Sequence, residues 1–84
     1  MTSRHLRTLA AVFEVPVRAN ILWSDIEALC MYLGGTVRSA AGSRVKLKLN
    51  GVAAVFHRPH PRKEAKRSVI REVNLFLDSA GVRP

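Results

Sequence analysis

The sequence predicts an α+β domain in which helices cover one face of a three-stranded antiparallel sheet and leave the other face open. Two observations support this fold class. Apolar residues recur with helical spacing in the first 33 residues and again after residue 64. Between these segments, Asn50-Gly51 separates two runs of alternating residues, which is the strongest short-range signal for a β-hairpin.

The composition indicates a small domain with a polyanionic partner. A chain of 84 residues makes a single domain with a limited core. Its formal charge is +8, and ten of the fourteen Lys and Arg residues fall between Arg38 and Arg71, where Glu64 is the only acid. Clustered cations of this kind favour nucleic acid as the partner. An anionic membrane surface fits less well, because the apolar face of the basic helix is needed for the core.

The sequence also indicates the cellular compartment and the division of the chain into segments. It has neither an apolar run of about 18 residues nor a signal-peptide pattern, so we expect a cytoplasmic protein. The single Cys30 permits no internal disulfide. We expect residues 1–20 to form an N-terminal helix and connector, and residues 21–84 to form one globular unit.

Two helices precede the sheet in this prediction. The first begins at Ser3 and buries the apolar stripe Leu6, Leu9, Ala10 and Phe13, and Pro16 ends it. The second begins at Asp25 behind a capping box, with Ser24 as N-cap and Glu27 at the third position. It buries a stripe consisting of Ile26, Leu29, Cys30 and Leu33, and ends at Gly34 and Gly35.

The sheet is predicted with its register. A short strand over 36–39 leads through a turn into the hairpin, whose two-residue turn places Arg44 opposite His57. One face of the hairpin is then apolar, and the other carries Lys46, Lys48 and the Arg44–His57 pair. A final helix is expected from Arg62, with a buried face of Ala65, Val69, Val73, Phe76, Leu77 and Ala80 and a basic side of Lys63, Lys66, Arg67 and Arg71.

This order of elements resembles the double-stranded-RNA-binding domain, an α-β-β-β-α core that carries a lysine-rich start on its last helix, here Arg62 to Arg67. The resemblance becomes more specific at three segments taken together. They are Gly42-Ser43 before the hairpin, the HRPHP run from His57 to Pro61 after it, and LDSAGV from Leu77 to Val82. In this combination the chain resembles the HicA family over residues 21–82.

The resemblance implies a toxin of a bacterial type II toxin–antitoxin pair. Such a toxin has the double-stranded-RNA-binding-like fold, cleaves messenger RNA as an endoribonuclease and uses no metal cofactor. It also implies a HicB-like antitoxin that covers the active face. A homo-oligomer or a toxin–antitoxin hetero-oligomer is compatible with these expectations.

One position departs from the family pattern. Most HicA chains place a catalytic histidine directly after the Gly-Ser pair, where this chain has Arg44. The facing His57 offers a replacement as general base or acid, because histidine changes charge near neutral pH. Arg44 and Lys46 would stabilise charge on the phosphorane oxygens. His60 is an alternative base, a partner acid or a structural residue.

The remaining candidate residues contact RNA phosphates in this hypothesis. They are Arg38, Lys46, Lys48, Arg58, Arg62, Lys63, Lys66 and Arg67. His57 and His60 have no third metal ligand near them in sequence, so we expect no metal site. The rival interpretation is a non-catalytic RNA-binding module of the same fold. A DNA-binding regulator is disfavoured, because the sequence has no helix-turn-helix pattern.

Overall fold

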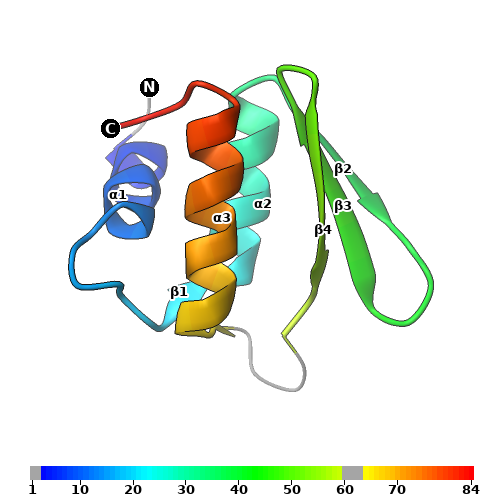
Figure 1. Ribbon diagram of the computed structural model, residues 1–84, viewed down its shortest axis with the longest axis horizontal. Coiled ribbons are helices and arrows are strands. Elements are labelled where there is room, and N and C mark those ends of the chain that lie inside the picture. The colour runs from blue at the N-terminus through cyan, green and yellow to red at the C-terminus, as the bar shows by residue number, and fades with distance from the viewer. Residues whose placement is uncertain (1–2, 60–63) are drawn as a thin grey trace.

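The computed structural model describes residues 3–59 and 64–84 and confirms the α+β fold class. In Figure 1 the helices lie on one side of the main antiparallel sheet, and the other side of that sheet is open. The elements in order are α1 (Ser3–Val12), β1 (Ile21–Leu22), α2 (Trp23–Tyr32), β2 (Thr36–Ser39), β3 (Arg44–Leu49), β4 (Val52–His57), β5 (Glu64–Ala65) and α3 (Arg67–Ser79).

The sheet is an antiparallel meander of order β2-β3-β4, and its register is the predicted one. Asn50 and Gly51 have φ of 50° and 80°, as both central residues of a type I′ turn require. Counting outward from this turn places Arg44 opposite His57. Because side chains alternate along a strand, Val45 and Leu47 then point into the core.

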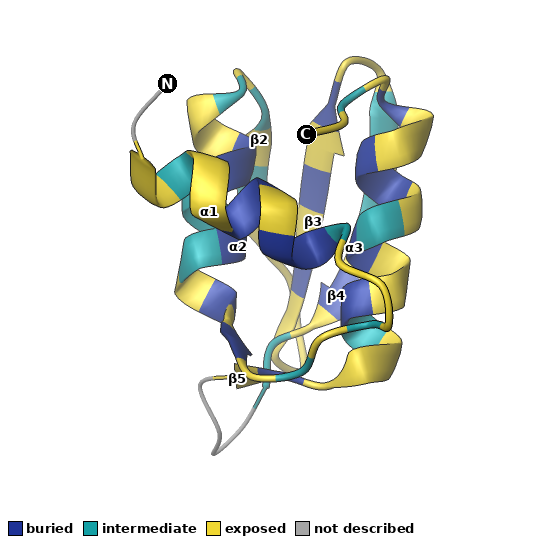
Figure 2. Ribbon diagram, turned by 90° about the vertical axis from the view of Figure 1, so that its left-hand side faces the viewer, coloured by how far each residue is buried: buried dark blue, intermediate teal, exposed yellow. Residues whose placement is uncertain are grey.

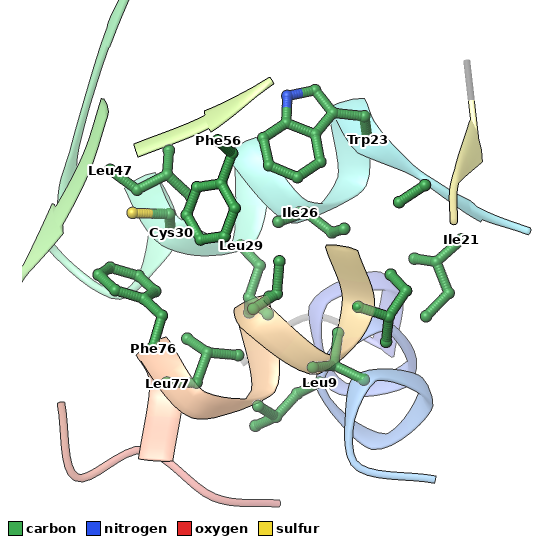
Figure 3. Packing of buried hydrophobic residues seen from close by; sticks show 14 of the residues in the cluster. Leu9, Ile21, Trp23, Ile26, Leu29, Cys30, Leu47, Phe56, Phe76 and Leu77 are labelled. Carbon is green, nitrogen blue, oxygen red and sulfur yellow. The ribbon is translucent and has the colours of Figure 1, made fainter. Parts of the chain in front are cut away.

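The core lies between the sheet and the helices. Figure 3 shows Trp23 and Ile26 of α2 packed near Phe56 of β4, with Leu77 of α3 and Leu9 of α1 on the far side. The rings of Trp23 and Phe56 are 5.5 Å apart and tilted, and Phe56 meets Phe76 edge-on at 6.1 Å. Helix α1 thus belongs to the same hydrophobic cluster as the rest of the chain.

The apolar stripe predicted for α1 is wrong in its details. The buried residues are Thr8, Leu9, Ala11 and Val12, whereas Leu6 is half exposed and Ala10 is exposed. Figure 2 shows this alternation of buried and exposed positions along the helix. The helix is rotated because it packs against both α2 and α3. His5 stacks on Tyr32 with ring centroids 4.4 Å apart.

Helix α2 begins at Trp23, and the predicted capping box is absent. Its N-cap is Leu22, which makes no side-chain cap hydrogen bond. Both carboxylates near this end bind distant arginines instead, Asp25 binding Arg4 and Glu27 binding Arg58. Because the helix begins at Trp23, Ser24 lies inside its first turn and cannot act as the N-cap.

Helix α3 begins at Arg67, and the prediction of a start near Arg62 is wrong. Glu64 and Ala65 form the short strand β5, which pairs antiparallel with β1 through Ile21 opposite Ala65. The pairing buries both of these side chains. Lys66 follows as the N-cap with extended backbone. The buried face of α3 also includes Ile70, a fully buried residue that the predicted face lacked.

Gly35 sits where helix α2 meets the sheet. A Cβ atom at Gly35 would lie 2.6 Å from the carbonyl oxygen of Lys48 and 2.7 Å from Sγ of Cys30. The first neighbour is a backbone atom, and the second ends a short side chain that is buried in the core. Burial raises the pKa of the Cys30 thiol, and the Glu27 carboxylate acts in the same direction. The thiol therefore serves as a small apolar group at this contact.

We predict that Gly35→Ala lowers the free energy of unfolding by about 1–3 kcal/mol, the range for overpacking. Urea denaturation followed by circular dichroism measures the change. Ser24→Ala is the control, because its hydroxyl makes no cap bond and the substitution should stay within about 0.5 kcal/mol. An unchanged midpoint for Gly35→Ala would show that the close approach does not exist.

Candidate functional site

The open face of the sheet gathers the candidate residues from all three strands. We call this surface the open sheet face, and it consists of the outward side chains Thr36, Arg38, Arg44, Lys46, Lys48, Ala53, Val55 and His57. All eight are exposed. Strand pairing sets Lys46 between Arg38 and Val55, and sets Lys48 between Thr36 and Ala53. The register thus turns alternate residues of β3 into a row of three cations.

The charges of this face are not neutralised within the described part of the chain. The ion pairs found there join Arg4 to Asp25, Arg18 to Glu14, Arg58 to Glu27 and Arg83 to Asp78. None of these pairs includes a residue of the open sheet face. No acidic residue occurs in the sequence between Glu27 and Glu64. The face is therefore a surface of one sign, as polyanion binding requires.

A hollow of about 380 Å³ lies on this face and is lined by Thr36, Arg38, Lys46 and Lys48. Three cations and one hydroxyl group line it from two adjacent strands. These groups are hydrogen-bond donors that suit phosphate oxygens. The hollow therefore offers donors and charge that suit an anionic ligand, one register step from the Arg44–His57 pair.

His57 and Arg44 stand side by side at the end of the hairpin, as predicted. Directly opposed residues have Cβ atoms about 4.5–5.5 Å apart. Nε of Arg44 donates a hydrogen bond of 3.0 Å to the carbonyl of Ala41, which holds the guanidinium against the β2–β3 turn. Ser43 is the last residue of that turn and has φ of 62°, and its carbonyl accepts a hydrogen bond of 2.9 Å from the Arg58 amide. The ladder therefore continues past His57 and fixes its backbone.

Arg58 follows His57, and its side chain joins the sheet to helix α2. Its Nε donates to Glu27 Oε2 at 3.0 Å, and its Nη1 donates to Ser39 Oγ at 2.9 Å. The same Glu27 oxygen accepts from the indole N–H of Trp23. The Arg58 charge is therefore paired within the protein, with the Glu27 carboxylate. Its predicted role as a phosphate ligand remains a prediction, and the geometry favours an anchor for the strand end.

Two further candidate cations, Lys66 and Arg67, lie apart from the open sheet face. Lys66 and Arg67 are exposed at the start of α3, and Arg67 Nε donates to the carbonyl of Val17 at 3.3 Å. In Figure 1 this start lies at the same end of the molecule as the end of β4. The candidates His60, Arg62 and Lys63 lie outside the described residues.

Comparison with known proteins identifies the family. A family model described as the HicA toxin of bacterial toxin–antitoxin systems matches residues 23–82, which is more than half of the chain. The chain belongs to the HicA toxin family. A toxin of this kind is one half of a toxin–antitoxin pair, so an antitoxin is its expected partner. No curated protein and no solved structure matched the chain.

No group of three or more His, Cys, Asp or Glu side chains in residues 3–59 and 64–84 is placed to hold a metal ion. Over the same residues, no helix has the length and apolar character needed to cross a membrane.

Sequence reasoning missed Glu27 as a partner of the site. It assigned this carboxylate to a cap three residues from Ser24, although the structure joins it to Arg58, 31 positions away. One signal was available, because Glu27 is the last acid before the 36-residue acid-free stretch that contains the open sheet face. A partly buried Arg in that stretch needs a carboxylate, and Glu27 is the nearest one that precedes it.

We predict that Glu27→Ala destabilises the HicA chain by about 2 kcal/mol, because the buried Trp23 N–H and the Arg58 guanidinium lose their acceptor. Thermal unfolding followed by tryptophan fluorescence measures the loss. Glu72→Ala serves as the control, since Glu72 is exposed and has no ion pair among the described residues. Equal unfolding temperatures for the two variants would rule out the network.

Proposed function

We propose that this HicA chain is a messenger-RNA endoribonuclease that needs no metal ion. The observation that carries the proposal is the placement of His57 beside Arg44 on a cationic face with no carboxylate. Family membership supports the toxin role. The chain acts in the cytoplasm, where messenger RNA is found, and a HicB-like antitoxin binds it in a toxin–antitoxin complex.

The reaction uses a nucleophile that the substrate supplies. The ribose 2′-hydroxyl attacks the adjacent phosphorus, and His57 accepts its proton as general base. The bond from phosphorus to the 5′-oxygen breaks, and an acid returns a proton to that oxygen. The products are a 2′,3′-cyclic phosphate and a 5′-hydroxyl end. His60 is the candidate acid, four residues before Glu64 and outside the described residues.

Two cations next to His57 stabilise the transition state. Charge grows on the nonbridging oxygens as the phosphorane forms, and preorganised donors at that place lower the barrier. Arg44 retains donors for this task, because its described contact uses Nε alone. Lys46 follows on the same face of β3 and adds an ammonium, while Arg38 and Lys48 hold flanking phosphates at the hollow.

A second function is favoured by one observation. The family's catalytic histidine position holds Arg44 in this chain, and a guanidinium does not accept protons at neutral pH. A chain that has lost cleavage would remain an RNA-binding module with the same open sheet face. Fragment analysis distinguishes the two functions, because only the enzyme produces cyclic-phosphate ends.

We predict that His57→Ala slows cleavage of a labelled single-stranded RNA about 10²–10⁴-fold, the usual contribution of a general base. The assay contains excess chelator, and the fragment ends are analysed for cyclic phosphate. His5→Ala is the matched control, because His5 stacks on Tyr32 in the helical layer and should leave the rate unchanged. Equal rates for wild type and His57→Ala would move the chemistry away from His57. RNA binding without any fragments would select the non-catalytic module.

We also predict that Lys46→Ala and Lys48→Ala each weaken RNA binding and flatten its salt dependence. For single strands each phosphate contact contributes about 0.7 to the slope of log K against log salt. Fluorescence anisotropy at several salt concentrations measures that slope. All proteins in this assay also carry His57→Ala, so that the RNA is not cleaved. Arg7→Ala on α1 removes the same charge away from the sheet, so its slope should match the parent. If Arg7→Ala changes the slope as much as the Lys substitutions do, the change reflects the net charge of the protein and not contacts at the open sheet face.

A further inference from the structure

Strand β4 lies at an edge of the sheet, and half of its backbone groups have no partner among the described residues. In a two-residue hairpin the pair that flanks the turn is hydrogen-bonded, here Leu49 and Val52. The amide of Arg58 donates to Ser43, which confirms this alternation at the other end of the strand. The N–H and C=O groups of Ala53, Val55 and His57 therefore point away from β3.

This edge lacks the features by which natural proteins protect sheet edges. Edge strands are commonly short, bulged, or marked by Lys or Pro. Strand β4 reads VAAVFH, spans six residues without a charged Lys, Arg, Asp or Glu, and pairs with β3 in unbroken register. The opposite edge, β2, is four residues long and carries Arg38. The contrast indicates that β4 is the edge built to accept another strand.

An apolar groove runs beside the same edge. It has a volume of about 300 Å³ and lies between β4 and α3. Phe56 and Phe76 contribute to its lining, and Leu75 stands at its side with 65% of its surface exposed. Glu72 and Ser79 add a polar rim. A strand added to β4 would turn every second side chain toward this groove.

The charges of the open sheet face select the kind of strand. The alternate side chains of an added strand would lie beside Ala53 and Val55, which are small. Across them stand Lys48 and Lys46, the register partners of these two residues. Neighbouring strands are about 4.8 Å apart, so a Glu or Asp on the added strand can reach these ammonium groups over the small side chains. A second copy would bring a like charge of +8 instead.

We propose that the antitoxin inserts an extended segment along β4 as a fourth strand, with acidic residues over the open sheet face and apolar residues in the groove beside Leu75. Strand addition to an exposed edge is an established mode of peptide recognition. The segment neutralises Lys46 and Lys48 and covers the outer side of His57. The inhibitory consequence rests on the proposed function, whereas the docking itself rests on the edge, the groove and the family.

Amide hydrogen exchange measured by NMR tests the docking directly. The compared samples are the free chain and its complex with the antitoxin of its toxin–antitoxin pair. The amides of Ala53, Val55 and His57 should exchange at least tenfold more slowly in the complex. The amides of Val52, Ala54 and Phe56 are protected by β3 in both samples and serve as internal controls. Unchanged exchange at the three outward amides in a formed complex would overturn the proposal.

The same measurement distinguishes an antitoxin strand from a strand of a second copy of this chain. If protection of the outward amides rises with the concentration of the free chain, the edge binds a second copy, and the proposal of an antitoxin strand is overturned. Because the readout is binding, it is independent of cleavage. A wild-type chain that leaves RNA intact would overturn the proposed enzyme, yet the exchange pattern would still report on the docking.

Two substitutions test the edge and the groove in turn. Val55→Pro removes an outward N–H without removing a bond to β3, and should weaken antitoxin binding at least tenfold. Leu75→Glu should weaken it as much by placing a charge beside the groove, while RNA cleavage stays unchanged. Leu6→Glu is the matched control, because Leu6 is a half-exposed leucine on α1. Antitoxin affinity that is equal for Leu75→Glu and Leu6→Glu would overturn the proposal.

Discussion

The register of the β3–β4 hairpin is the constraint on which the rest of the molecule depends. Side chains alternate along a strand, so a slip of one residue would expose Val45 and Leu47 and bury Lys46. The turn that sets the register is held twice. Its backbone takes the left-handed conformation at both central residues, and Nδ2 of Asn50 donates to the carbonyl of Ala80 at 2.9 Å. That bond ties the turn to the C-cap of α3.

The other end of the hairpin is held by charge. Glu27 lies on α2, Arg58 follows β4, and Ser39 ends β2, so one network joins a helix to both edges of the sheet. Arg58 is about one third exposed, which keeps the cost of desolvating it moderate. A domain of this size has little apolar surface to bury. The charged network beside the core therefore holds the end of β4 in place, and with it the backbone of His57.

Local chemistry explains how much of the structure the sequence predicts. The hairpin, its register and the side-by-side placement of His57 and Arg44 follow from a two-residue turn and a period of two, which need no distant information. The pairing of β1 with β5 involves residues more than forty positions apart and only two residues on each side. The start of α3 depends on that pairing, so it could not be predicted from helical spacing. The capping box failed for the same reason, because its carboxylate binds an arginine far along the chain.

The sequence predicts which face of the sheet the candidate residues occupy better than it predicts what their side chains contact. The structure assembles Arg38, Arg44, Lys46, Lys48 and His57 on one face, and it places Arg58 in an internal ion pair. Periodicity predicts the first result because it decides which face a residue occupies. Periodicity does not predict the ion pair of Arg58, since an Arg next to a strand end can point into solvent or toward the helices. Only the carboxylate across the fold decides between solvent and Glu27.

The small size of the domain also bears on how it is controlled. Helices cover one face of the sheet, so the open sheet face and the free edge of β4 are the parts of the sheet that a partner can reach (Figure 1). In the proposed enzyme His57 stands at the edge of that face, next to the backbone groups that β3 leaves unpaired. An added strand would therefore reach the catalytic position without any movement of the fold. In the proposed enzyme the histidine lies on the edge strand β4 and not on the inner strand β3, so the proposed catalytic position is one that a partner strand can cover.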